Sequence, residues 1–297
     1  MVNRSQLFSE CRTALEDSGI DTAHFDTLCI FQDMLADKNP LFKPQESVPD
    51  DAEKRIRELI KKRSEGYPLQ YLLGEWEFYG YPIKVGEGVL IPRPDTETLV
   101  DQVLEICRKN GMTSPKIADL CSGSGCIAIA LKKQLPSAEV YSVELSDKAL
   151  GYLRENIKLN NADITVIEGD VLKKEIQQQL SHLDIIVSNP PYLTGEEMRE
   201  LQTEVSHEPG LALFGGNDGL GFYRAITELW RKSLKLGGYI AYEFGEDQHD
   251  AVKKILTANS FDNIQFCRDG GGIIRTAAAQ KIADGIPRFI DISMQCG

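Results

Sequence analysis

The sequence lacks a long apolar run and an apolar leader. Its hydrophobic residues make up 42% of the chain, but they occur in stretches far shorter than the roughly 20 residues that a membrane-spanning helix needs. The first residues, Met1-Val2-Asn3-Arg4-Ser5, lack the apolar core of a secretion signal. We therefore expect a soluble cytoplasmic protein with no membrane partner.

Groupings of metal-binding residues are also lacking. The seven cysteines are odd in number and form no C-x-x-C pair, and the four histidines stand apart from one another. Scattered cysteines of this kind are typical of reduced thiols in the cytosol. We expect no metal site.

An excess of basic residues is absent as well. The chain has 45 acidic and 33 basic residues and a net charge of −12, whereas proteins that grip nucleic-acid phosphates usually carry a basic face. The short basic groups between Lys54 and Arg63 lie among acids on one helical pattern. We interpret them as a solvated helix face rather than a nucleic-acid patch, and expect no direct nucleic-acid binding.

The chain of 297 residues is long enough for two domains. Its first part shows apolar residues at helical spacing, for example Leu7, Cys11 and Leu15, and the next part alternates apolar and polar residues around Gly80. We predict a small helical domain, a β-hairpin linker, a catalytic α/β domain and a tail of unknown role, in residues 1–75, 76–92, 93–282 and 283–297.

Strand and helix patterns alternate from about residue 116 onward. Predicted strands lie at 117–120, 140–144, 164–167, 185–188, 239–244, 264–267 and 273–277. Predicted helices between them lie at 126–134, 147–160, 222–235 and 248–258. This alternation predicts a doubly wound, mostly parallel seven-stranded sheet. Only Asp269-Gly270-Gly271-Gly272 separates the last two strands, which therefore form an antiparallel hairpin at one edge.

A glycine-rich loop, Cys121-Ser122-Gly123-Ser124-Gly125, joins the first of these strands to a helix. Glycines let the backbone approach a ligand, and a helix start offers free N–H donors. Glu144 ends the second strand, where a carboxylate can accept ribose hydroxyls. Asp170 and Val171 close the third, where Asp170 could meet an adenine amino group.

Two ligands fit this loop. Gly123-x-Gly125-x-x-Ala128 satisfies the loose NAD fingerprint. S-adenosylmethionine has no pyrophosphate, and its sulfonium and ammonium are cations that Asp119 at the strand end could balance. Singly, Asp119, Glu144 and Asp170 could be ordinary strand-end acids. Because they end three successive strands, we favour S-adenosylmethionine, with S-adenosylhomocysteine as its product.

The turn Asn189-Pro190-Pro191-Tyr192 follows the apolar strand 185–188. Neither proline has an N–H to donate, and Pro190 biases Asn189 towards an extended conformation. The turn is therefore stiff, rich in hydrogen-bond acceptors and next to an aromatic ring. It suits an –NH2 group held by both hydrogens, but alone it does not distinguish a nucleobase from an amide.

These motifs resemble a known family. The glycine loop resembles that of class I S-adenosylmethionine-dependent methyltransferases, and Asn-Pro-Pro-Tyr is similar to the motif of enzymes that methylate adenine, cytosine or glutamine amide. Within that set the chain resembles the peptide chain release factor glutamine methyltransferases, the HemK/PrmC family. The closer match is carried by Pro68-Leu69-Gln70-Tyr71, Phe78-Tyr79-Gly80, residues 90–97, Glu208-Pro209, residues 215–220 and Glu243-Phe244-Gly245.

Two positions depart from the family pattern. Cys121 stands where the family often has glycine, which is compatible if the residue has ordinary dihedrals. Glu144 stands where the family usually has aspartate, and its longer side chain can still reach a ribose.

The resemblance implies a monomeric protein-(glutamine-N5) methyltransferase that acts on the Gly-Gly-Gln loop of release factors, docked by the helical domain. It implies that Asn189 and the Pro190 carbonyl hold the amide hydrogens and that Tyr192 packs on the amide plane. The alternatives are a DNA or RNA amino-methyltransferase acting on a flipped base, a nucleotide-binding regulatory module, and an NAD oxidoreductase.

Overall fold

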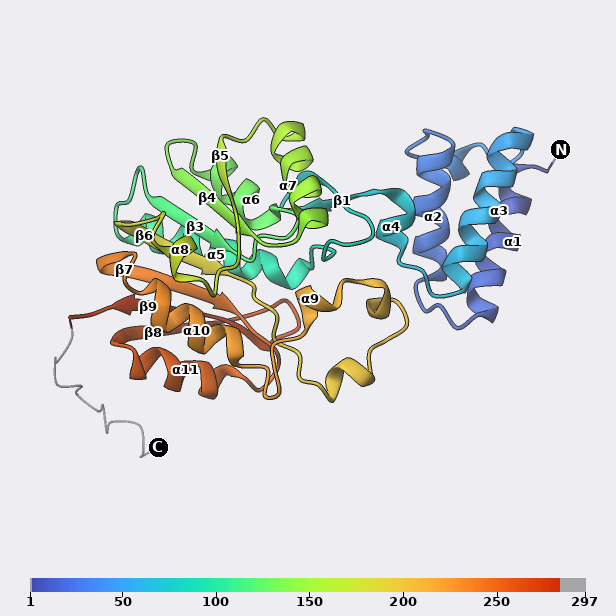
Figure 1. The fold of residues 1–297 in the computed structure, drawn as a ribbon. Coiled ribbons are helices and arrows are strands. Elements are labelled where there is room, and N and C mark those ends of the chain that lie inside the picture. Colours follow the sequence, from blue (N-terminus) through green and yellow to red (C-terminus); the bar gives the residue numbers. More distant parts are fainter. Residues whose placement is uncertain (1, 284–297) are drawn as a thin grey trace, which may run out of the picture.

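The protein is described here by a computed structural model that covers residues 2–283. The predicted tail, 283–297, lies outside the described residues from position 284 onward. Figure 1 shows a small helical unit at the N-terminus, joined through a hairpin to a larger α/β unit. No helix within residues 2–283 is long and apolar enough to cross a bilayer.

Three helices pack together in the N-terminal unit. They are α1 (Arg4–Asp17), α2 (Ala23–Met34) and α3 (Asp50–Ser64). The Asn3 side chain caps α1 by accepting the Gln6 N–H at 2.8 Å. The apolar stripes meet in a core that contains Leu7, Phe8, Cys11, Leu15, Ile30, Phe31, Ile56 and Ile60, as the helical spacing predicts.

The basic residues of α3 do not all lie on a solvated face, so the sequence interpretation was wrong at one position. Arg57 is exposed and pairs with Glu53 and Glu10. Arg63, in contrast, is buried, because α2 places Asp26 against its guanidinium. The sequence alone does not show that Asp26 lies against Arg63, and without that partner a basic residue on a helix is expected to face solvent.

The hairpin is formed by β1 (Glu75–Phe78) and β2 (Tyr81–Lys84), after the short helix α4 (Leu69–Leu73). Tyr79 and Gly80 both have positive φ, as a tight two-residue hairpin turn requires. Asn156 fastens the hairpin to the α/β unit, since its side chain accepts the Lys84 N–H at 2.6 Å and donates to the Lys84 carbonyl at 3.0 Å.

The α/β unit contains the predicted seven-stranded sheet, with strand order β5-β4-β3-β6-β7-β9-β8. All neighbouring strands are parallel except those that pair with β9. The strands are β3 (Lys116–Leu120), β4 (Glu139–Glu144), β5 (Ile164–Glu168), β6 (Leu183–Ser188), β7 (Leu234–Glu243), β8 (Phe261–Arg268) and β9 (Ile274–Lys281). Because the chain order reverses beside β3, the carboxyl ends of β3, β4 and β6 form a crevice of the kind that binds ligands.

Helices cover both faces of this sheet (Figure 1). Residues of α5 (Glu97–Lys109), α6 (Cys126–Gln134) and α7 (Asp147–Leu159) belong to the core on one face. The other core contains α10 (Gly221–Trp230) and α11 (His249–Ala258), with the short helix α8 (Lys174–Gln177) beside it. Adjacent strand residues such as Ile185 and Ile186 enter opposite cores, which explains the continuous apolar runs.

The predicted helix 222–235 is too long by several residues. α10 ends at Trp230, whose indole is fully buried and donates to the Val171 carbonyl at 2.7 Å. The Ser233 carbonyl then accepts the Leu183 N–H at 2.8 Å, and the chain enters β7 at Leu234. Strand pairing therefore overrides the helical pattern there.

The segment after β6 reaches back to the helical unit. In Figure 1 it extends from the α/β unit, before α9 (Gly210–Leu213), towards α3. Glu204 of this segment pairs with Arg63 at 2.6 Å. The His207 ring lies 5.0 Å from that of Tyr67, and a Cβ on Gly66 would lie 2.5 Å from the Thr203 side chain. The helical unit is thus attached twice, through the hairpin and through this segment.

Candidate active site

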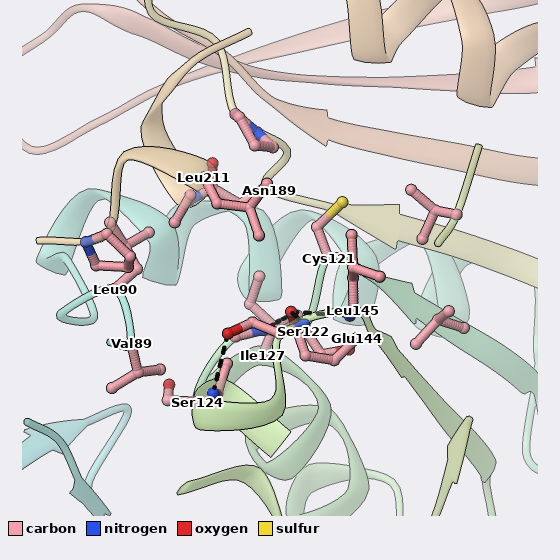
Figure 2. Close-up of a pocket in the computed structure, with 18 of the residues that line it drawn as sticks. Val89, Leu90, Cys121, Ser122, Ser124, Ile127, Glu144, Leu145, Asn189 and Leu211 are labelled. Atoms are coloured by element: carbon pink, nitrogen blue, oxygen red, sulfur yellow. Dashed lines mark hydrogen bonds between the residues drawn. The ribbon is translucent and has the colours of Figure 1, made fainter. Parts of the chain in front are cut away.

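A cavity lies at the carboxyl ends of β3, β4 and β6 (Figure 2). We call it the first cavity. The predicted cofactor residues on its wall are Cys121, Ser122, Gly123, Ser124, Glu144, Asp170, Val171 and Asn189. Gly125 and Asp119 are not on the wall. The sequence missed the opposite wall, which comes from residues 88–96 and from α9.

The glycines of the loop allow close packing. Gly123 and Gly125 have φ of 55° and 80°, in the left-handed region. A Cβ at Gly125 would lie 2.3 Å from the Leu153 side chain on α7. Gly125 therefore shapes the loop from behind, while Gly123 faces the ligand side.

Cys121 adopts a left-handed backbone conformation with a φ of 60°. The condition under which cysteine would fit this position without cost is therefore not met, because the loop turns at this residue as a glycine would. A non-glycine residue there costs roughly 1–2 kcal/mol. Its sulfur is drawn at the cavity in Figure 2, and burial raises the pKa of the thiol well above its ordinary value, so the thiol is neutral.

We expect the Cys121→Gly variant to be more stable than the Cys121→Ala variant by about 1 kcal/mol, because only glycine removes the left-handed strain. Both variants lack the Cys121 sulfur, so the difference between their stabilities does not include the loss of its contacts. Urea unfolding of both variants measures the difference. A glycine variant less stable than the alanine variant would show that the φ is not strained.

Glu144 connects β4 to the glycine loop. Its Oε2 accepts the Gly123 N–H at 2.8 Å, and its Oε1 accepts the N–H groups of Leu145 and Ser146 at 2.9 and 2.8 Å (Figure 2). A carboxylate offers about four acceptor positions, so about one is left for a ligand. The longer glutamate thus also organises the backbone around the cavity.

Asp119 is buried and does not lie on the cavity wall. Its side chain is 0% exposed, and neither carboxyl oxygen has a hydrogen-bond partner among the described residues. Burial raises the pKa of Asp119 to about 8, and the nearby Glu144 charge adds to this. Near neutral pH the group is therefore mostly protonated, which weakens the expectation that it balances a cationic ligand.

A second cavity lies beyond the Asn189 turn. Asn189, Leu90, Arg93 and Ala212 line both cavities, whereas Tyr192 lines only the second and Pro191 only the first. Pro190 lines neither. Of the site residues predicted from the sequence, Asn189 alone lines both the first and the second cavity.

The turn is braced from behind. The Gln248 side chain donates to the Tyr192 carbonyl at 3.0 Å. A Cβ on Gly215 would lie 2.6 Å from the Pro191 carbonyl oxygen, so the chain must be glycine to pass there. These contacts give a physical role to Gln248 and to the 215–220 segment.

Polar groups that the sequence analysis did not assign to the site surround Asn189. Its Nδ2 donates to Thr96 Oγ1 at 3.4 Å, and Glu243, buried at the end of β7, lines the second cavity. Arg93, which lines both cavities, pairs with Glu208, whose carboxylate also accepts the Ile91 N–H at 2.9 Å. Glu243 could have been found as a polar residue that ends an apolar strand; Thr96 carries no such signal.

Acidic, histidine and cysteine side chains do not cluster as metal ligands do. Within residues 2–283, no group of three or more of them could hold a metal ion. The two carboxylates of the first cavity, Glu144 and Asp170, lie at the ends of two different strands and accept backbone N–H groups.

The chain matches known families along most of its length. The PrmC N-terminal domain profile matches residues 6–74, and the methyltransferase small domain profile matches residues 96–208. A crystal structure of a methyltransferase from Pyrococcus furiosus shares the fold, with a TM-score of 0.52 over 79% of this chain and 100% of that one, at 16% identity.

Two relatives are much closer in sequence. The release factor glutamine methyltransferase of Fusobacterium nucleatum is 39% identical over 93% of this chain and 78% of that protein. The protein of the same name from Thermodesulfovibrio yellowstonii is 40% identical over 82% of this chain and 88% of that protein. The chain therefore belongs to the release factor glutamine methyltransferase family.

Proposed function

We propose that the chain transfers a methyl group from S-adenosylmethionine to the side-chain amide nitrogen of the glutamine in the Gly-Gly-Gln loop of peptide chain release factors. The observation that carries this proposal is the position of Asn189 between two cavities. Methyl transfer needs a donor and an acceptor that meet at one point from opposite sides. Membership of the family supports the choice of acceptor.

The residues of the first cavity fit S-adenosylmethionine. Glu144 would accept a ribose hydroxyl, Asp170 the adenine amino group, and the backbone of residues 121–124 would face the amino-acid part. Val171, Leu145 and Leu172 supply apolar surface for the nucleoside. When bound, the cofactor supplies an electrophilic methyl on a sulfonium.

The residues of the turn would hold the glutamine amide. An amide nitrogen is a poor nucleophile because its lone pair is delocalised into the carbonyl. The Asn189 Oδ1 would accept one N–H group and, although Pro190 is on the wall of neither cavity, its carbonyl would accept the other. Together they would orient the nitrogen and stabilise the positive charge that develops on it. Tyr192, on the wall of the second cavity, would pack on the amide plane.

The helical unit would serve as the docking surface for the protein substrate. We place the end of the helical unit at residue 75 and the end of the hairpin linker at residue 92, so that the catalytic domain spans residues 93–282. We propose that the protein acts as a monomer in the cytoplasm. The double attachment through the hairpin and through Glu204 supports a docking unit held at a set distance from the second cavity.

A methyl-transfer assay tests this function. We expect radiolabelled methyl from S-adenosylmethionine to appear on release factor and to be lost when its Gly-Gly-Gln glutamine is replaced by alanine. Duplex DNA and transfer RNA serve as parallel acceptors. Labelling that survives loss of the glutamine, or labelling of a nucleic acid instead, contradicts the proposal.

A further inference from the structure

The second cavity contains a buried acid that the chemistry above does not use. Glu243 is 3% exposed, whereas the other acids of this cavity, Glu197, Glu200 and Glu246, are exposed. It ends β7, the strand that pairs with β6, so it lies beside the residue that follows β6, Asn189. The Glu243 carboxyl group is thus buried in the wall of the second cavity, next to the Asn189 turn.

The contacts of Glu243 join it to Asn189. Thr96 and Asn189 both lie near its carboxyl group, since both lower the pKa of Glu243. The Asn189 Nδ2 also donates to Thr96 Oγ1 at 3.4 Å. This contact with Thr96, itself a neighbour of Glu243, places the NH2 end of the Asn189 amide on the Glu243 side.

One oxygen of the carboxyl group, Oε2, is buried and has no hydrogen-bond partner among the described residues. A buried acceptor without a partner destabilises the fold. Packing alone therefore gives no reason for a carboxyl group at this position, where a glutamine or methionine side chain would fit with less cost.

An asparagine amide can act as donor or acceptor, depending on which way it is turned. We propose that Glu243, as a carboxylate, is a positioning residue that fixes Asn189 with Oδ1 towards the acceptor nitrogen and strengthens Oδ1 as a hydrogen-bond acceptor. The inference rests on the proposed function and deepens it, since the acceptor nitrogen is that of the glutamine amide.

The charge state of Glu243 depends on its surroundings. Burial raises its pKa to about 7; Thr96, Arg275 and Asn189 lower it, and the charge of Asp95 raises it. Arg275 is itself paired with Asp269 at 3.0 Å. The other titratable neighbours, Tyr192, Tyr223 and Cys126, stay neutral because burial raises the pKa of each. Turnover should therefore rise with pH through about 7, as the carboxylate form fills.

The decisive variant is Glu243→Gln, which keeps the shape and removes the charge. We expect its kcat at saturating cofactor to fall about 100-fold, its affinity for S-adenosylmethionine to stay within twofold, and its rise in kcat near pH 7 to disappear. Asp247→Asn is the matched control. It removes one exposed charge from the same segment, and asparagine tolerates the positive φ at this residue.

Thermal unfolding separates this role from a purely structural one. A raised pKa in the folded state means that stability falls as pH rises from the ordinary value of 4.5 towards 7. The Glu243→Gln variant, which cannot ionise, should melt at pH 8 no lower than the wild type. A structural role predicts a lower melting temperature and an unchanged pH profile.

The outcomes are distinct. If the wild type does not methylate release factor, the proposed function fails and this inference fails with it. If the wild type is active and Glu243→Gln retains its kcat or its pH dependence, only the role of Glu243 is overturned.

Discussion

Replacing Asn189 by alanine should lower turnover by about 1000-fold or more, because the variant loses both the orientation of the amide and a group that stabilises its developing charge. Asn189 is only one of many residues on the wall of the first cavity. Affinity for S-adenosylmethionine should therefore change by no more than a few-fold. Single-turnover methylation and calorimetric titration of the cofactor measure the two quantities.

Asn189→Asp is the informative companion variant. It keeps an acceptor oxygen but loses the NH2 group that faces Thr96 and Glu243. It also places two carboxyl groups side by side, so that one of them takes up a proton. We expect turnover between that of alanine and the wild type. Near-normal turnover in Asn189→Ala would show that the Asn189 side chain does not contribute to methyl transfer.

Replacing Asp26 by alanine should lower the free energy of unfolding by about 3–5 kcal/mol, the usual effect of leaving a buried charge without its partner. Arg63 Nε lies 2.6 Å from Asp26 Oδ2, and both side chains are 3% exposed. One guanidinium nitrogen, Nη1, already lacks a hydrogen-bond partner within residues 2–283. The variant would leave Arg63 with only the distal pairing to Glu204.

Two control variants define the cause. Asp26→Leu combined with Arg63→Met removes both charges and should recover most of the loss, since apolar residues of similar size replace buried pairs well. Glu204→Gln should cost only about 1 kcal/mol or less, because the Glu204 side chain is 43% exposed. Urea unfolding followed by circular dichroism measures each. A loss below 1 kcal/mol in Asp26→Ala would mean that water reaches Arg63.

The sheet could be predicted because its strands are apolar on both faces and are separated by helices. Ile185, Ile186 and Val187 form an unbroken apolar run for this reason. The end of α10 could not be predicted, because it depends on Ser233 meeting Leu183, a contact between distant segments. The local sequence pattern shows that a helix forms, but here a contact between distant segments decides where it ends.

The site was predictable to the extent that it lies at strand ends. Parallel strands bring their carboxyl ends to one edge, so Glu144, Asp170 and Asn189 could be expected together, and all three line the first cavity. Asp119 also lies near a strand end, yet it is fully buried and is not on the wall of the cavity. Strand ends predict the edge of the sheet but not the direction of a side chain.

The double attachment of the helical unit bears on how the chain folds during synthesis. Glu204 is 141 residues beyond Arg63, which at ribosomal rates of 5–20 residues per second corresponds to roughly 10 s. In that interval the helices can complete their own core, but Arg63 has only Asp26 as its counterion. Because Asp26 already neutralises Arg63, the first helices can fold before the rest of the chain has been synthesised. Glu204 then pairs with an Arg63 side chain that Asp26 already holds in position.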